Sequence, residues 1–336
     1  MRIVYVLESL EQGGGVKVLI EHAEGLAARG HDVSIVTRDA RHAWIDVGVP
    51  VVEVPVFDER TLPEADVHVA TWFPTVVPAV RARRARRVFH FSQGYEMPHP
   101  HLAGRRSEIE EAYRQEIPKL VISPHILEEL RGYPGPFHLL SQAIPWERFL
   151  PPDPERRARR EPATLGLVGP YESAMKGIRH GLEAVARLRA EGRAVRLLRA
   201  SQFPQSEGER RVLAADEYAH ALPVAEMPAF YRRLDLLLFT SFDAEGSPLP
   251  PLEAMASGVP VVLTDIPSFR GLPADAVSRV PAGDGAAMAA AAATLLDDAE
   301  LWAARRARGL ALARTFSLAP VLDELERLFG ADQKTS

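Results

Sequence analysis

The stretch 236–263 constrains the fold more than any other part of the chain, because it reads as a complete β-loop-α-β unit. It begins with the apolar run Leu236–Phe239, which is typical of a strand buried in a parallel sheet. A polar loop follows, and Pro250 and Pro251 then stand where a helix would begin, since proline suits the first helical turn. The apolar run Val259–Leu263 predicts the next strand. We therefore expect a parallel α/β sheet that binds ligands at the carboxyl ends of its strands.

Two carboxylates lie on the same edge of this unit. Glu245 ends the first half of the loop, and Glu253 is expected in the first turn of the helix. A helix N-terminus and the loop amides before it attract anions such as a diphosphate. A carboxylate at that place instead accepts hydrogen bonds from the hydroxyls of a sugar or a ribose. Alternatively, Glu253 only complements the helix dipole and Glu245 caps the loop. The pair around one glycine- and proline-rich turn favours a nucleotide-sugar site.

Composition limits the class of protein. The 336 residues suffice for two domains, and the net charge of -5 argues against nucleic-acid binding. The chain has no cysteine, which excludes thiolate chemistry and cysteine-bound zinc. His99 and His101 lack a third ligand at suitable spacing, so no metal is predicted. No apolar run approaches the ~20 residues of a membrane span, and we expect a cytoplasmic protein.

The beginning of the chain is a second β-loop-α-β pattern. A strand over 3–7 leads to a loop containing Gly13–Gly15, then to a helix and to a strand over 33–37. The dinucleotide fingerprint G-x-G-x-x-G fails at its third glycine, where Val18 stands. A dinucleotide-dependent oxidoreductase is therefore the weaker alternative, although the small residues would let the backbone approach a phosphate.

The pattern restarts after Pro151–Pro162, which has the composition of a linker. A strand over 164–168, a polar turn over 169–177 and a helix over 178–188 follow. Two α/β halves joined by one linker predict two Rossmann-like domains facing a central cleft.

Two further features lie in the first half. His90, Gln93 and Glu96 fall near the end of a predicted strand, where side chains line binding sites. The segment 80–87 is predicted to form a basic helix face, a candidate for weak peripheral contact of Arg81–Arg87 with anionic lipid at the inner face of the membrane. A solvated arginine-rich face is the favoured explanation of that segment.

Stretches from end to end resemble a retaining family 4 glycosyltransferase, of the glycosyl transferases group 1 and the GT-B fold. The most specific is the pair of glutamates separated by seven residues, Glu245 and Glu253. The matching stretches are VYVLESLEQGGGVKVLIEHAEGLAARGHDVSIVT (4–37), SQAIPWERF (141–149), LGLVGPYESAMKGIRHGLEAV (165–185), EGSPLPPLEAMASGVPVVLTD (245–265) and VPAGD (280–284).

The resemblance implies an enzyme that moves a hexosyl or deoxyhexosyl group from a nucleotide-diphosphate sugar to a glycan, lipid-linked or small-molecule acceptor. It implies that Glu245 holds hydroxyls of the transferred sugar and that Glu253 holds the ribose. Lys176 would neutralise the leaving diphosphate, without a metal ion and with no cofactor beyond the nucleotide sugar. The implied donor-binding residues are Gly14, Gly15, Gly169, Gly246, Ser247, Pro248, Leu249 and Glu253, and the acceptor-side candidates are His90, Gln93 and Glu96.

It also implies a division of the chain. Residues 1–155 would form the acceptor domain and residues 156–316 the donor domain, with 317–330 forming a helix that packs back on the first domain. Pro170 replaces the arginine that usually lies beside the phosphates, Pro248 replaces a glycine, and Gln93 occupies the position of a histidine. These departures keep open a degenerate protein that binds a nucleotide sugar or glycan without turnover. The segment after Gln93 and the proline-rich loop resemble the branch that builds deoxysugar-containing surface polysaccharides.

Overall fold

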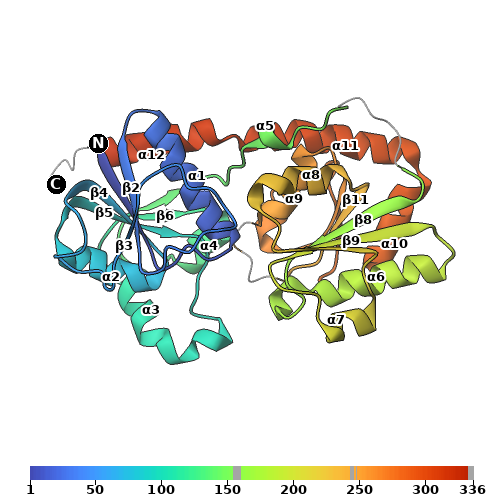
Figure 1. Ribbon diagram of the computed structural model, residues 1–336, viewed down its shortest axis with the longest axis horizontal. Helices are drawn as coiled ribbons and strands as arrows, with labels where there is room; N and C mark the ends of the chain where they lie inside the picture. Colours follow the sequence, from blue (N-terminus) through green and yellow to red (C-terminus); the bar gives the residue numbers. More distant parts are fainter. Residues whose placement is uncertain (154–159, 243–245, 247, 332–336) are drawn as a thin grey trace. The chain divides into compact units, whose positions relative to one another are not determined.

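The computed structural model describes residues 1–153, 160–242, 246 and 248–331, and these residues form two compact units (Figure 1). Unit 1 comprises Met1–Ala143 and Leu318–Ser336, and unit 2 comprises Ile144–Ser317. The division falls before the boundary predicted at residue 155. The reason is that the Ile144 amide donates a hydrogen bond to the Phe316 carbonyl at 2.9 Å, and α5 (Trp146–Phe149) packs against helices of unit 2.

Unit 1 is built on a parallel sheet in which β1 is an interior strand that pairs with both β2 and β4. The order reverses between β1 and β4, and such a switch point is where open α/β sheets bind ligands. The strands are β1 (Arg2–Leu7), β2 (Asp32–Thr37), β3 (Val51–Glu53), β4 (Ala65–Thr71), β5 (Ala85–Ser92), β6 (Lys119–Val121) and β7 (Phe137–Leu139), in the order β3-β2-β1-β4-β5-β6-β7.

The last helix of the chain packs on unit 1. A Cβ atom on Gly25 of α1 would lie 2.6 Å from Leu322 Cδ1 of α12, so the two helices touch closely there. The Arg29 guanidinium lies 2.7 Å from carboxylate oxygens of Asp323 and Glu326. The helices of unit 1 are α1 (Gly14–Ala28), α2 (Phe73–Ala82), α3 (Arg106–Tyr113), α4 (Pro124–Glu129) and α12 (Leu318–Gly330), with a 3₁₀ turn at Pro100–Arg105.

The segment 80–87 does not form the basic helix face predicted from its sequence. Helix α2 ends at Ala82, Arg83 adopts a left-handed backbone with φ 51°, and β5 starts two residues later. Arg87 lies in that strand and donates to the carbonyls of Leu328 and Ala331, so that it caps the C-terminus of α12. Membrane contact through this segment stays a prediction. Three other arginines of the segment form ion pairs, which are Arg81–Glu111, Arg84–Glu64 and Arg86–Asp66.

Unit 2 contains a second parallel sheet, with β8 and β11 at its centre. Helices α6 and α10 cover one face, and α8, α9 and α11 cover the other (Figure 1). The strands are β8 (Ala163–Val168), β9 (Val195–Ser201), β10 (Glu217–His220), β11 (Leu236–Phe239), β12 (Val261–Thr264) and β13 (Ser278–Val280), in the order β10-β9-β8-β11-β12-β13. The helices are α6 (Ile178–Ala190), α7 (Glu207–Val212), α8 (Met227–Arg232), α9 (Leu249–Ala256), α10 (Gly285–Asp297) and α11 (Ala299–Ala313), with 3₁₀ turns at Ala174–Lys176, Val224–Glu226, Pro267–Phe269 and Arg314–Phe316.

Two parallel α/β units confirm the fold class predicted from the sequence. Within the part of the chain that the structure describes, no helix has both the length and the apolar character needed to cross a bilayer.

Candidate functional site

In unit 2, the turn that carries Lys176 is fixed to the carboxyl end of β11. The Thr240 hydroxyl donates to the Lys176 carbonyl at 2.7 Å, and the Phe242 amide donates to the Met175 carbonyl at 2.8 Å. Lys176 itself is half-buried, and its aliphatic stem packs against Gly169, at the end of β8. The structure thus places the predicted lysine at the carboxyl edge of the sheet.

Gly177 makes this attachment possible. Its backbone has φ +57°, and a Cβ atom there would lie 2.2 Å from the Thr240 carbonyl oxygen. Any larger residue would push the turn away from β11, because a contact below 3.0 Å with backbone cannot be relieved by a side-chain movement. The sequence Lys176-Gly177 therefore sets the position of the lysine.

A buried ion pair lies next to the end of β8, and it was not predicted from the sequence. The side chains of Arg199 in β9 and Glu209 in α7 are fully buried, with Arg199 Nε 2.7 Å from Glu209 Oε1. The guanidinium also donates to the Leu167 carbonyl at 2.7 Å and to the Gly169 carbonyl at 2.9 Å. Arg199 thereby supports the loop after β8. The signal was an arginine inside the otherwise apolar core of a strand, VRLLRAS.

Glu253 lies in α9 and is only 5% exposed. The helix begins at Leu249 with Pro248 as its N-cap, so Glu253 falls in the second turn and not in the first turn predicted. This position weakens the explanation of Glu253 as a partner of the helix dipole, an effect confined to the first turn. The Tyr231 hydroxyl donates to Glu253 Oε2 at 2.8 Å. Burial and the neighbouring carboxylate raise the pKa of Tyr231 well above its usual value, which keeps the phenol protonated as a donor.

Only part of the predicted donor loop falls within the described residues. Glu245 and Ser247 lie outside the described residues. Gly246 is half-buried, and Pro248 and Leu249 are buried at the start of α9. Tyr231 was missed because nothing in its own segment, MPAFYR, predicts a contact with Glu253, which lies 22 residues later.

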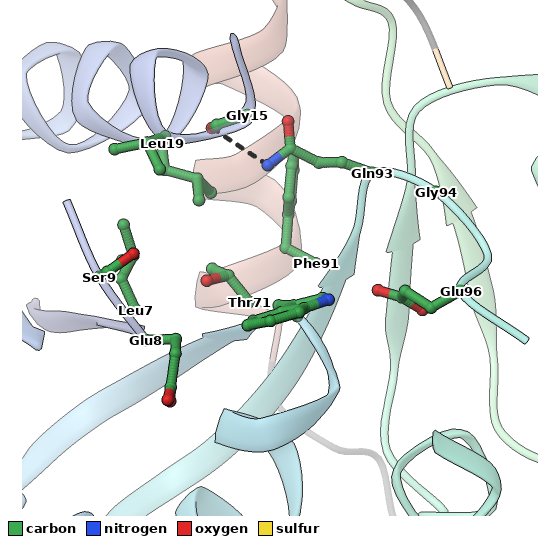
Figure 2. Close-up of a pocket in the computed structure, with 12 residues that line it drawn as sticks. Leu7, Glu8, Ser9, Gly15, Leu19, Thr71, Phe91, Gln93, Gly94 and Glu96 are labelled. Carbon is green, nitrogen blue, oxygen red and sulfur yellow. Dashed lines mark hydrogen bonds between the residues drawn. The ribbon is translucent and has the colours of Figure 1, made fainter. Parts of the chain in front are cut away.

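Unit 1 contains a cavity of about 230 Å³ at the switch point of its sheet (Figure 2). It lies at the carboxyl ends of β1, β4 and β5 and beside the first turn of α1, which begins at Gly14. Gly15 lines it, and Gln93 Nε2 donates to the Gly15 carbonyl at 3.1 Å. The wall thus contains Gly15 and Gln93, which the sequence predicted for the site. Glu96, another acceptor-side candidate, also lines the cavity, as do Glu8 and Trp72, which the sequence did not single out.

His90 is not part of this cavity. It is fully buried in β5, with its ring centroid 4.8 Å from that of Tyr113. Neither ring nitrogen has a hydrogen-bond partner among the described residues. Burial, and to a smaller extent Lys119, lowers the pKa of His90 to about 3, so the ring is neutral at physiological pH. This corrects the sequence-based placement of His90 on the acceptor side, because a strand alternates faces and His90 points into the core.

Glu96 is held at one side of the cavity. The Tyr113 hydroxyl donates to Glu96 Oε2 at 2.6 Å. Burial raises the pKa of Glu96 to about 7, although the hydrogen bond from Tyr113 acts in the opposite direction. The carboxyl group therefore changes its protonation near neutral pH.

Within residues 1–153, 160–242, 246 and 248–331, no three histidine, aspartate or glutamate side chains are grouped so as to hold a metal ion.

Part of unit 2 matches a known protein family. Residues 162–298, which include the Lys176 turn and α9, match the family model described as Glycosyl transferases group 1. The chain is 41% identical over 114 residues to the lipopolysaccharide core biosynthesis mannosyltransferase LpsB of Rhizobium meliloti (strain 1021). The aligned stretch covers 32% of this chain and 32% of that protein. It is also 31% identical over 222 residues to the O-antigen biosynthesis protein RfbC of Myxococcus xanthus. That alignment covers 64% of this chain but 17% of the relative.

The fold as a whole also has solved counterparts. Anabaena HepE, solved in complex with UDP-glucose, superposes with a TM-score of 0.79 at 16% identity, covering 98% of this chain and 99% of that one. Together with the two parallel α/β units, such likenesses establish that the chain has the GT-B fold.

Proposed function

We propose that the chain is a retaining glycosyltransferase that moves a sugar from a nucleotide-diphosphate sugar to an acceptor in lipopolysaccharide- or O-antigen-type synthesis. The observation that carries the proposal is the arrangement of Lys176 and Glu253 in unit 2. Both belong to the segment that matches the group 1 family model, and Lys176 is held at the carboxyl edge of the sheet. The relatives from Rhizobium meliloti and Myxococcus xanthus support a role in surface polysaccharides.

In this proposal the charge of Lys176 stabilises the diphosphate as it leaves. The anomeric carbon loses its bond to the diphosphate oxygen and forms a bond to the acceptor oxygen, whose proton passes to the diphosphate. Glu253 accepts hydrogen bonds from the ribose hydroxyls, with Tyr231 fixing its carboxylate. Glu245 accepts hydrogen bonds from the hydroxyls of the transferred sugar, and amides of the loop before α9 contact the phosphates. Positioning and charge stabilisation supply the rate acceleration, without a metal ion.

A thermal-shift panel followed by a transfer assay tests the function. Nucleoside diphosphates and nucleotide sugars should raise the melting temperature, because a ligand at ~100 times its Kd adds ~2.7 kcal/mol to stability. Radiolabel from the stabilising nucleotide sugar should then appear in a truncated lipopolysaccharide acceptor. Stabilisation by nicotinamide dinucleotides alone would contradict the proposal and favour an oxidoreductase. Binding of the nucleotide sugar with no transfer or hydrolysis would favour the degenerate binding protein.

The roles of the two glutamates can be separated by calorimetry with the nucleoside diphosphate that this panel selects. Glu253→Gln keeps the shape but loses the charge, and we expect its Kd for the bare nucleotide to rise tenfold or more, since hydrogen bonds to a charged group contribute ~1.5–3 kcal/mol. Glu245→Gln should leave that Kd nearly unchanged while it lowers turnover.

Tyr231→Phe is the matched variant for Glu253→Gln, because it removes only the donor to the carboxylate. We expect a smaller, few-fold increase in Kd. Equal losses of bare nucleotide binding in the two glutamate variants would refute this division of roles.

A further inference from the structure

Trp72 is an unusual residue in the cavity of unit 1. Its side chain lines the cavity and remains 39% exposed, although most large hydrophobic side chains of the unit are buried. Its backbone has φ 61° and ψ 146°, a conformation that glycine adopts easily and a bulky residue does not. Such strain costs ~1–3 kcal/mol and is typical of ligand-binding sites. The ring packs edge-on against Phe73, with centroids 5.0 Å apart, which fixes its orientation.

Polar acceptors surround the same space. One carboxylate oxygen of Glu8, Oε1, is paired with Arg38, while Oε2 is buried and has no hydrogen-bond partner among the described residues. Gln93 and Glu96 contribute to the wall (Figure 2). Glu8 Oε2 is closed off from solvent, so a ligand in the cavity would be hydrogen-bonded through Gln93 and Glu96.

The charge balance identifies the class of ligand. Arg38 offsets the charge of Glu8, and no lysine or arginine is among the described residues that line the cavity. A phosphate or a uronic acid would therefore find no counter-charge there. A cation would find Glu8 already paired and Glu96 only partly charged near neutral pH, because burial raises the pKa of Glu96 to about 7. A ligand rich in hydroxyl groups fits both the acceptor oxygens and the aromatic face. At about 230 Å³ the cavity is smaller than the ~300–1,000 Å³ of sites for drug-sized ligands, and it suits a single ring.

We propose that this cavity binds one neutral sugar ring, stacked on Trp72 and hydrogen-bonded through its hydroxyls to Gln93 and Glu96. That the ring belongs to the acceptor rests on the proposed glycosyltransferase function. Trp72 is then the residue that determines which acceptor sugar is taken, because the stacked face of the ring must be apolar while its hydroxyls point to the wall.

Saturation-transfer NMR on the full chain tests this with a panel of methyl glycosides of neutral hexoses and deoxyhexoses. The matched charged probes are a methyl glucuronide and a methyl glucosaminide. We expect saturation transfer to at least one neutral glycoside and about tenfold weaker binding of the charged probes. Trp72→Gly removes the ring and relieves the positive φ, so it should fold normally yet bind that glycoside at least tenfold more weakly. Trp72→Phe should retain most of the affinity.

Phe203→Ala is the control, because Phe203 is an aromatic residue of unit 2 that is 49% exposed, and its removal should change nothing. Unchanged binding in Trp72→Gly, no binding of any neutral glycoside by the wild type, or a preference for a charged probe would each overturn the proposal. Nucleotide stabilisation in the thermal-shift panel should persist in Trp72→Gly. A wild-type chain that binds neutral glycosides but no nucleotide would refute the proposed function, while the proposal of a sugar site in this cavity would be retained.

Discussion

Lys176→Ala is expected to lower turnover by about a hundredfold or more with little change in stability, the scale of losing one charge contact to the transition state. In the proposed reaction the leaving diphosphate must be neutralised by an ion or by protein groups. The turn is held to β11 through Thr240 and Gly177, so the backbone of Lys176 is fixed before a substrate binds. Pro170 stands where the resembled family has an arginine, which leaves more of the charge to Lys176.

The controls for this prediction come from the same segment. Lys176→Arg should recover only part of the activity, because a planar guanidinium does not replace a compact ammonium in a tight turn. Arg179→Ala removes an exposed cation of α6 that pairs with Glu183 at 2.8 Å, and it should leave turnover within about twofold. Activity should persist in chelator. Full activity of Lys176→Ala, or complete loss in chelator, would show that another group supplies the charge.

Local sequence was sufficient for β1, β2, β8, β11 and β12, for the turn at Lys176 and for the helix that carries Glu253, but it did not predict the short strands β7, β10 and β13. Apolar runs and glycine or proline boundaries determine those elements within a few residues. The predicted basic helix over 80–87 was wrong because the segment leaves the helix at Arg83 and joins β5, where pairing with β4 outweighs helix propensity.

Contacts between distant segments were not predictable in this way. The hydrogen bond from Tyr231 to Glu253 and the support of the Gly169 carbonyl by Arg199 each join two elements that are separate in sequence. The strained backbone of Trp72 has no local signal either, because nothing in the sequence around it requires a positive φ. Such residues become visible only when packing is known.

Arg199→Met is expected to destabilise unit 2 by about 3–5 kcal/mol, because it leaves Glu209 charged and buried without its partner. The Gly169 and Leu167 carbonyls also lose their donor, which adds to the cost of removing the arginine alone. The measurement is urea unfolding followed by tryptophan fluorescence. In a Trp44→Phe, Trp72→Phe background the remaining tryptophans, Trp146 and Trp302, both lie in unit 2 and report its unfolding.

The double variant Arg199→Met, Glu209→Leu separates the cost of an unpaired charge from the value of the pair. Replacing both partners of a buried ion pair by apolar side chains is often neutral or stabilising, so we expect the double variant to regain most of the lost stability. Arg211→Met is the matched control, since Arg211 pairs with Glu207 on the exposed surface of the same helix and its replacement should cost less than about 1 kcal/mol.

Turnover separates a role in stability from a role in positioning the loop. Because Arg199 supports the loop beside Lys176, the double variant should be stable yet at least tenfold slower. A double variant as unstable as Arg199→Met, or as active as the wild type, would show that the pair does not position this loop.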